Sequence, residues 1–164
     1  MKDIKEIVEK YYREFYLDET EDIYKDLKKL ITQYADDLKR NIVSNVFRCD
    51  YSESSTMLAA VNALKYFYME NYPDLFYNWL TSLEKVEFAE FAGFLFSQQD
   101  LKMPNLKSIE NFGFSNSNIT SLEAPKLEQI GYKAFDASGI KEIMASENCD
   151  YAGLPAKVKI WLGW

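Results

Sequence analysis

The sequence of 164 residues contains no histidine, only two cysteines and four prolines. Without histidine, the chain lacks the side chain that most often serves as general base and metal ligand. It contains no G-x-S-x-G motif and no glycine-rich phosphate loop, and its serines have no histidine to activate them. We therefore expect a protein that is not an enzyme and that holds no cofactor and no metal ion.

Other absences concern location and partners. No apolar run approaches the roughly 20 residues that a membrane span needs, and the first ten residues are charged throughout, unlike a secretory signal. Cys49 and Cys149 lie far apart, so two unpaired thiols in a reducing compartment are favoured over a bridge. The formal charge of −7 argues against direct binding to nucleic-acid phosphates. We expect a soluble, cytoplasmic protein without membrane contact.

Two groups of acidic residues could be read as a metal or acid–base cluster: Asp18 to Asp22 and the pair Asp36-Asp37. Acidic side chains at a helix start are expected because they face the positive end of the helix dipole, and an exposed acidic pair is common. We favour this second interpretation. The segment 115–118, Ser-Asn-Ser-Asn, is predicted to be a turn.

Residues 1–79 have the apolar spacing of amphipathic helices. Ile23, Leu27, Leu30 and Ile31 illustrate the stripe, and Thr20 is a candidate N-cap before it. Pro73 is expected to end one helix or begin another. The predicted helices run from Lys2 to Leu17, Glu21 to Phe47, Ser55 (with Ser54 as N-cap) to Asn71, and Pro73 to Trp79.

From Leu80 onward the pattern changes to a repeat of about 20 residues. LTSLE at 80–84 returns as ITSLE at 119–123, and three copies are expected to close at Phe96, Phe114 and Phe135. Aligning the copies on these rings pairs Phe91 with Ile109 and Ile130, pairs Phe88 with Leu106 and Leu127, and makes the middle copy three residues short. Such a period indicates a solenoid, in which each unit buries its apolar face against the next.

The last segment, 152–164, alternates Val158 and Ile160 with Lys157 and Lys159. This alternation predicts a closing strand over the last repeat. The sequence thus predicts an α+β protein with a helical module at 1–79 and a short repeat solenoid with a strand cap at 80–164.

The repeat unit L-x-x-L-x-x-P-x-L-x-x-I-x-x-x-A-F resembles the BspA-type leucine-rich repeats of bacterial and some protozoan proteins. The best match is ITSLEAPKLEQIGYKAFDASGIKEI, from Ile119 to Ile143, where Phe135 takes the place of the family's aromatic and Ile130-Gly131 that of its IG pair. The first copy has Phe91-Ala92 at the IG position and the second has Ile109-Glu110. The resemblance covers Leu80 to Ala145 and implies short parallel strands stacked into a curved sheet that binds other proteins.

Two functions from different classes remain open. The first is a non-catalytic module that binds a protein partner, with solvent-facing strand positions and N-terminal tyrosines in the interface. The predicted partner-binding residues are Thr81, Glu84, Lys102, Thr120, Glu123, Lys141, Glu142, Tyr12 and Tyr16. The alternative is a small acidic inhibitor of the phage anti-defence, anti-CRISPR-like kind, which would block the nucleic-acid site of a nuclease complex with carboxylates arranged along one face.

Overall fold

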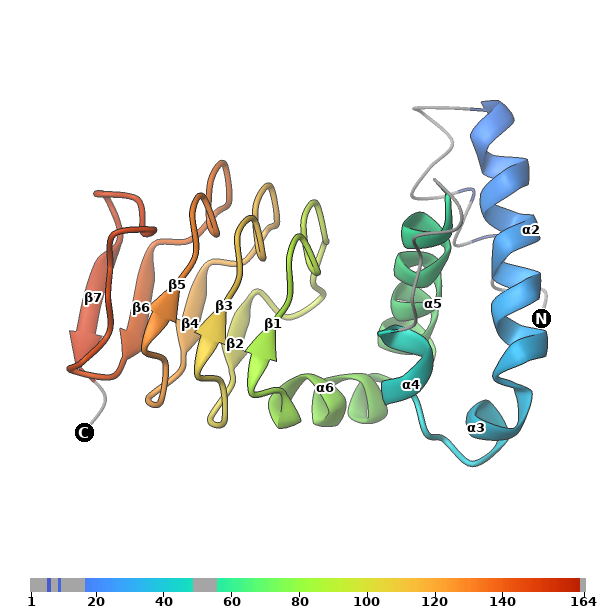
Figure 1. Cartoon of the computed structure of the whole chain (residues 1–164), viewed down its shortest axis with the longest axis horizontal. Helices are drawn as coiled ribbons and strands as arrows, with labels where there is room; N and C mark the ends of the chain where they lie inside the picture. Colours follow the sequence, from blue (N-terminus) through green and yellow to red (C-terminus); the bar gives the residue numbers. More distant parts are fainter. Residues whose placement is uncertain (1–5, 7–8, 10–16, 49–55, 163–164) are drawn as a thin grey trace. The chain divides into compact units, whose positions relative to one another are not determined.

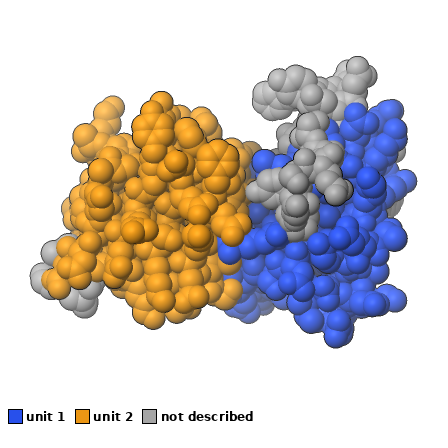
Figure 2. Space-filling model, viewed as in Figure 1, with its two compact units in different colours: residues 1–79 blue, residues 80–164 orange. Residues whose placement is uncertain are grey.

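The computed structural model describes residues 6, 9, 17–48 and 56–162 (Figure 1). The chain divides into two compact units, residues 1–79 and residues 80–164 (Figure 2). The first contains helices, and the second contains a β-solenoid of about four turns that ends in a strand. The predicted α+β class is confirmed.

The helical unit is built around the apolar stripe of its first described helix. This helix, α2 (Leu17–Gln33), buries Ile23, Leu27 and Leu30 at the i, i+4 and i+7 positions. The partner helix α5 (Met57–Asn71) is buried along most of its length, including Val61 and Leu64. Three shorter helices also lie within the described residues: α3 (Ala35–Lys39), α4 (Ser44–Phe47) and α6 (Pro73–Ser82).

The predicted single helix from Glu21 to Phe47 is wrong, because the chain breaks twice within it. Asn41 has a φ of 58°, and the amide N–H groups of Asn41 and Ile42 donate to the carbonyls of Leu38 and Asp37 at 3.1 and 2.8 Å. This is a Schellman motif, and asparagine is the residue after glycine that best tolerates its left-handed position. Thr20 lies inside α2 and is not its cap. The predicted helix from Lys2 to Leu17 falls mostly outside the described residues, as does Ser54.

The solenoid contributes two strands per turn, not the single strand that the resemblance implied. One sheet, which we call sheet A, has the order β1 (Lys85–Val86), β3 (Ser108–Ile109) and β5 (Gln129–Ile130). The other, sheet B, has the order β2 (Asp100–Lys102), β4 (Ser121–Glu123), β6 (Glu142–Ala145) and β7 (Lys159–Leu162). All pairs are parallel, as Figure 1 shows for the stacked arrows. The closing strand predicted at the C-terminus is β7.

Aromatic rings stack along the solenoid core, one from each of its first three turns. Phe91, Phe114 and Phe135 form a continuous stack, with ring centroids 5.5 Å apart at both steps and interplanar angles of 14° and 6°. All three are buried. The predicted alignment is therefore wrong for the first copy, because Phe91 and not Phe96 is the counterpart of Phe114.

The sheet register corrects the remaining repeat equivalences. Val86 pairs with Ile109 and Ile109 with Ile130, so Val86 takes the position that was predicted for Phe91. Phe88, which the predicted alignment paired with the buried Leu106 and Leu127, is 59% exposed. Lys85 pairs with Ser108, 23 positions on, and Ser108 with Gln129, 21 positions on, so the first copy is longer by two residues and the middle copy is not short.

Candidate functional site

The outer surface of sheet B carries two straight columns of side chains. Leu101, Leu122 and Ile143 are in register with one another and point into the core. Because side chains alternate along a strand, the residues on either side of each face outward. We call this surface the sheet B face. Its columns are Asp100, Ser121, Glu142 and Lys159, and Lys102, Glu123, Met144 and Trp161.

Neighbouring side chains of the face interact across the strands. The Lys102 Nζ lies 3.9 Å from the Glu123 Oε2. The Trp161 Nε1 donates to the Glu142 Oε2 at 3.3 Å, and the Lys159 Nζ lies 4.5 Å from the centre of the Trp161 ring. Exposed ion pairs contribute little to stability, so these side chains remain available for exchange with partner groups.

Asp100 is the most firmly held carboxylate of the face. Its Oδ1 accepts hydrogen bonds from the hydroxyls of Ser121 and Thr120, each at 2.8 Å. These bonds, the one from Ser121 first, hold the pKa of Asp100 below its usual range. Asp100 therefore presents a fixed anion at the first strand of sheet B.

The structure brings together only part of the predicted partner-binding set. Lys102, Glu123 and Glu142 lie on the sheet B face, and Thr120 and Lys141 directly precede β4 and β6. The prediction that Thr81 and Glu84 are strand positions is wrong, because neither residue lies in a strand. Tyr12 and Tyr16 lie outside the described residues.

Thr81 lies in helix α6, and Glu84 precedes β1 of sheet A, where its Oε1 lies 3.2 Å from the Lys107 Nζ. The segment LTSLE at 80–84 therefore differs in conformation from ITSLE at 119–123, which enters strand β4. Local sequence identity does not fix conformation here, because α6 continues through the first three residues of the earlier copy.

Sequence reasoning missed the apolar end of the face. Trp161 is 48% exposed, and Met144 beside it is half-buried. The alternation of Lys157 and Lys159 with Val158 and Ile160 already places Trp161 on the same side of the strand as the lysines. That signal would have sufficed to add Trp161.

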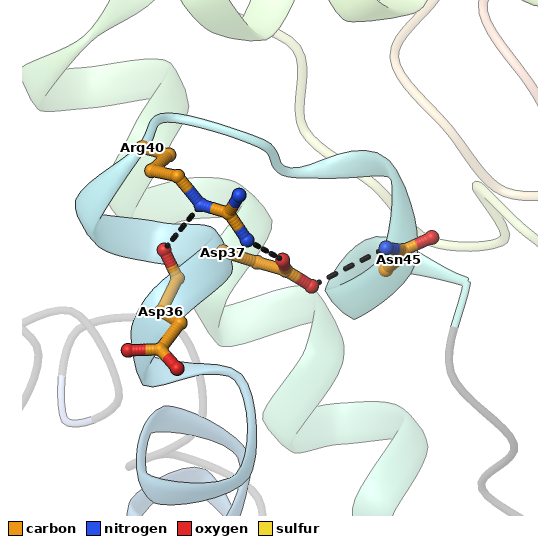
Figure 3. Close-up of polar contacts among 4 residues, drawn as sticks. All are labelled: Asp36, Asp37, Arg40 and Asn45. Carbon is orange, nitrogen blue, oxygen red and sulfur yellow. Dashed lines mark hydrogen bonds and ion pairs between the residues drawn. The ribbon is translucent and has the colours of Figure 1, made fainter.

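The acidic pair Asp36-Asp37 has a structural role (Figure 3). The Asp37 Oδ1 lies 3.4 Å from the Arg40 Nη2, and its Oδ2 accepts a hydrogen bond from the Asn45 Nδ2 at 3.3 Å. The Arg40 Nε donates to the backbone carbonyl of Asp36 at 3.4 Å. The Asp37 carboxylate thus links α3 to α4 across the loop at Asn41.

The serines of the repeat turns also bond locally, as predicted for turn residues. The Ser117 hydroxyl donates to the Phe114 carbonyl at 2.7 Å, and the Ser138 hydroxyl repeats this bond to Phe135 one turn later. Among the residues that the structure describes, no group of three or more potential ligand side chains is placed to hold a metal ion. No helix within the described ranges has the length and apolar character needed to cross a membrane.

Charge on the sheet B face is mixed. The carboxylates of Asp100, Glu123 and Glu142 are interleaved with the ammonium groups of Lys102 and Lys159, and Lys141 lies at the edge of the face. A nuclease inhibitor of the alternative kind needs carboxylates along one face, and this face does not supply them. That alternative stays a prediction without support from sheet B.

Stacked parallel strands, a repeated turn and a ring from each of three successive turns define the second unit as a repeat solenoid. Residues 84–156 match the family model of the BspA type leucine rich repeat region (6 copies). The C-terminal part of the chain therefore matches the BspA-type leucine-rich repeat, as the resemblance indicated. No curated protein and no solved structure gives a significant match to the chain.

Proposed function

We propose that this protein is a non-catalytic interaction module that binds a protein partner through the sheet B face. The observation that carries the proposal is the pair of outward columns, held in register by four parallel strands and ending in Met144 and Trp161. Repeat solenoids commonly bind partners along such stacked surfaces, while their interiors only pack.

The chemistry of the face supports a division of roles. Methionine and tryptophan are enriched in protein interfaces, and tryptophan is among the residues that most often dominate binding energy. Trp161 would therefore serve as the anchor. The interleaved charges from Asp100 to Lys159 would select a partner of complementary pattern, since charged groups at an interface contribute more to specificity and association rate than to affinity.

The experiment is quantitative affinity capture with the full chain as bait. Trp161→Ala and the charge reversal Lys102→Glu alter the face, and Lys29→Glu, on the exposed side of α2, makes the same charge change elsewhere. The proposal predicts one or more partners whose recovery falls at least tenfold with Trp161→Ala and severalfold with Lys102→Glu, but not with Lys29→Glu. Recovery that is the same with all three variants would overturn it.

A further inference from the structure

Three aromatic side chains meet on the surface of the solenoid, away from the sheet B face. Phe88, Phe112 and Tyr132 lie in the turns that follow β1, β3 and β5, which Figure 1 shows side by side. The Phe112 ring lies 5.9 Å from each of the other two, at interplanar angles of 82° and 88°. We call this group the aromatic strip.

The two outer rings of the strip are largely exposed to solvent. Phe88 is 59% exposed and Tyr132 is 62% exposed. Phe112, the central ring, has a φ of 59°, a left-handed conformation that is unfavourable for a bulky side chain. The equivalent residues of the neighbouring turns, Ala89 and Lys133, have the same left-handed φ, so the geometry of the repeat sets this conformation and places the Phe112 ring between the other two.

The surface is hollowed at two places beside the strip. One hollow, of about 560 Å³, is lined by Phe88 and Asn111 and crosses the outer surface of sheet A as far as Asp150. The other, of about 420 Å³, is lined by Tyr132, Lys133 and Pro155. The larger hollow thus runs along the solenoid axis past Phe88, and the smaller one adjoins Tyr132 at the last turn.

Polar groups beside the rings face the same hollows. The Asn111 Oδ1 accepts a hydrogen bond from the backbone N–H of Tyr132 at 2.8 Å, which leaves the amide Nδ2 of Asn111 as a donor at the surface. The Tyr132 hydroxyl supplies a second donor. In the larger hollow, Lys85 is offset by Glu110 at 3.1 Å, so the carboxylate of Asp150 gives that hollow a net negative charge.

The spacing of the strip selects an extended ligand with a three-residue period. Phe88 and Tyr132 lie two turns of the solenoid apart, and adjacent parallel strands are separated by about 4.8 Å, so the two rings repeat at about 9.6 Å along the axis. A polyproline II helix rises about 3.1 Å per residue and repeats every three residues, at about 9.3 Å. Residues i and i+3 of such a helix would meet Phe88 and Tyr132.

We propose that the aromatic strip binds a proline-rich peptide in the polyproline II conformation, with a basic side chain directed at Asp150. Proline rings pack on Phe88 and Tyr132, and Phe112 forms the floor between them. The peptide carbonyls, which have no internal hydrogen-bond partners in this conformation, accept from Asn111 and Tyr132. This site is separate from the sheet B face, so the peptide proposal can be correct even if the proposed protein binding by that face is not.

The test is fluorescence anisotropy with the full chain and labelled synthetic peptides. The probes are a ten-residue proline peptide with two arginines at its C-terminal end, the same peptide with the arginines at its N-terminal end, and a glycine–serine peptide with the same arginines. One proline peptide should bind, and the glycine–serine peptide should bind at least tenfold more weakly. Phe88→Ala and Tyr132→Ala should each weaken binding about tenfold, and Asp150→Asn should weaken it severalfold and reduce its salt dependence.

Two variants separate ring contact from other effects. Tyr132→Phe keeps the ring and should weaken peptide binding only two- to threefold. Trp161→Ala, on the sheet B face, should leave the peptide affinity unchanged. Binding that does not depend on proline or on the strip residues would overturn the proposal. So would the absence of peptide binding at millimolar concentration, whether or not the strip then binds a β-glucan oligosaccharide or a second copy of the chain.

Discussion

At the scale of single residues, each of the first three solenoid turns contains two left-handed residues four positions apart. The pairs are Ala89 and Gly93, Phe112 and Asn116, and Lys133 and Ala137. Only Gly93 and Asn116 are residue types that favour this conformation. The turn geometry is therefore imposed by the stacking of the turns rather than by local preference.

Replacing Ala137 with glycine should stabilise the solenoid. Ala137 is exposed with a φ of 54°, so glycine removes backbone strain without leaving a cavity. We expect a gain of about 0.5–1 kcal/mol, measured as a rise of about 1–4 °C in the thermal midpoint of the strand signal in circular dichroism. Ala152→Gly is the control, because Ala152 is exposed without a positive φ; that change should be neutral or destabilising.

Asn118 holds the two extra residues of the first turn. Its Oδ1 accepts from the Phe96 N–H at 2.7 Å, and its Nδ2 donates to the Phe96 carbonyl at 2.9 Å, so one side chain replaces a pair of backbone bonds. Asn118→Asp removes the donor and sets a carboxylate oxygen against that carbonyl. We expect a loss of about 1–3 kcal/mol of folding stability in denaturant unfolding.

Asn148→Asp adds the same charge at an exposed turn position and provides the comparison. It should cost less than about 0.5 kcal/mol. Equal losses for the two variants would mean that charge, and not the bond to Phe96, accounts for the effect.

The thiol of Cys149 is expected to be inert. Burial, with the nearby carboxylates of Asp150 and Glu128, raises its pKa to about 11. Since the unfolded chain ionises this thiol at about pH 8.5, its protonated form stabilises the fold fully below that pH, and the contribution is lost as the pH rises through about 11.

In a Cys49→Ser variant, the rate of alkylation by iodoacetamide should rise with an inflection near pH 11. In 6 M urea the inflection should return to the value of a free thiol, about pH 8.5. An inflection near pH 8.5 in the folded protein would contradict the buried environment of Cys149.

At the scale of elements, the phenylalanine stack distinguishes rings that hold the solenoid together from rings that do not. Phe114 is fully buried between Phe91 and Phe135, whereas Phe88 lies at the surface. Phe114→Ala should cost about 3–5 kcal/mol of stability in denaturant unfolding, and Phe88→Ala less than about 1 kcal/mol. Similar costs for the two variants would contradict the difference in burial between Phe114 and Phe88.

The repeat, the helical first half and the closing strand could be predicted from the sequence because each depends on a local apolar period. The register could not, because Phe91 and Phe96 are both aromatic, both buried and both near the end of the first copy. Only the stack on Phe114 distinguishes them. The second strand of each turn was missed because β1, β3 and β5 have two residues each, too few for an alternation to appear.

The break in the long predicted helix has a different cause. Asn41 fits either a helix surface or a left-handed cap, and the apolar stripe from Leu38 to Val46 continues across it. The Schellman hydrogen bonds to the carbonyls of Asp37 and Leu38 show that Asn41 adopts the left-handed cap and ends the helix. For the candidate site, Lys102, Glu123 and Glu142 could be predicted from strand alternation, whereas Thr81 was misplaced because a helix occupies the first copy of its motif.

At the scale of the whole molecule, the chain combines a helical unit with a repeat solenoid whose outer surfaces carry its distinctive chemistry. Exposed Trp161 and the interleaved charges of the sheet B face account for the proposed protein binding. Lys159 in the last strand also protects the outer edge of the sheet, because its charged side chain discourages pairing with another strand. The central claim is therefore that a partner covers the sheet B face.

Lysine acylation with mass spectrometry, on the chain alone and in complex with its captured partner, tests this claim most directly. Lys102, Lys141 and Lys159 report on the sheet B face, whereas Lys29 and Lys107 are exposed on α2 and beside sheet A. The account predicts that the partner reduces labelling of the first three severalfold and leaves the other two unchanged. Protection of Lys29 or Lys107, with the sheet B lysines still fully labelled, would contradict it.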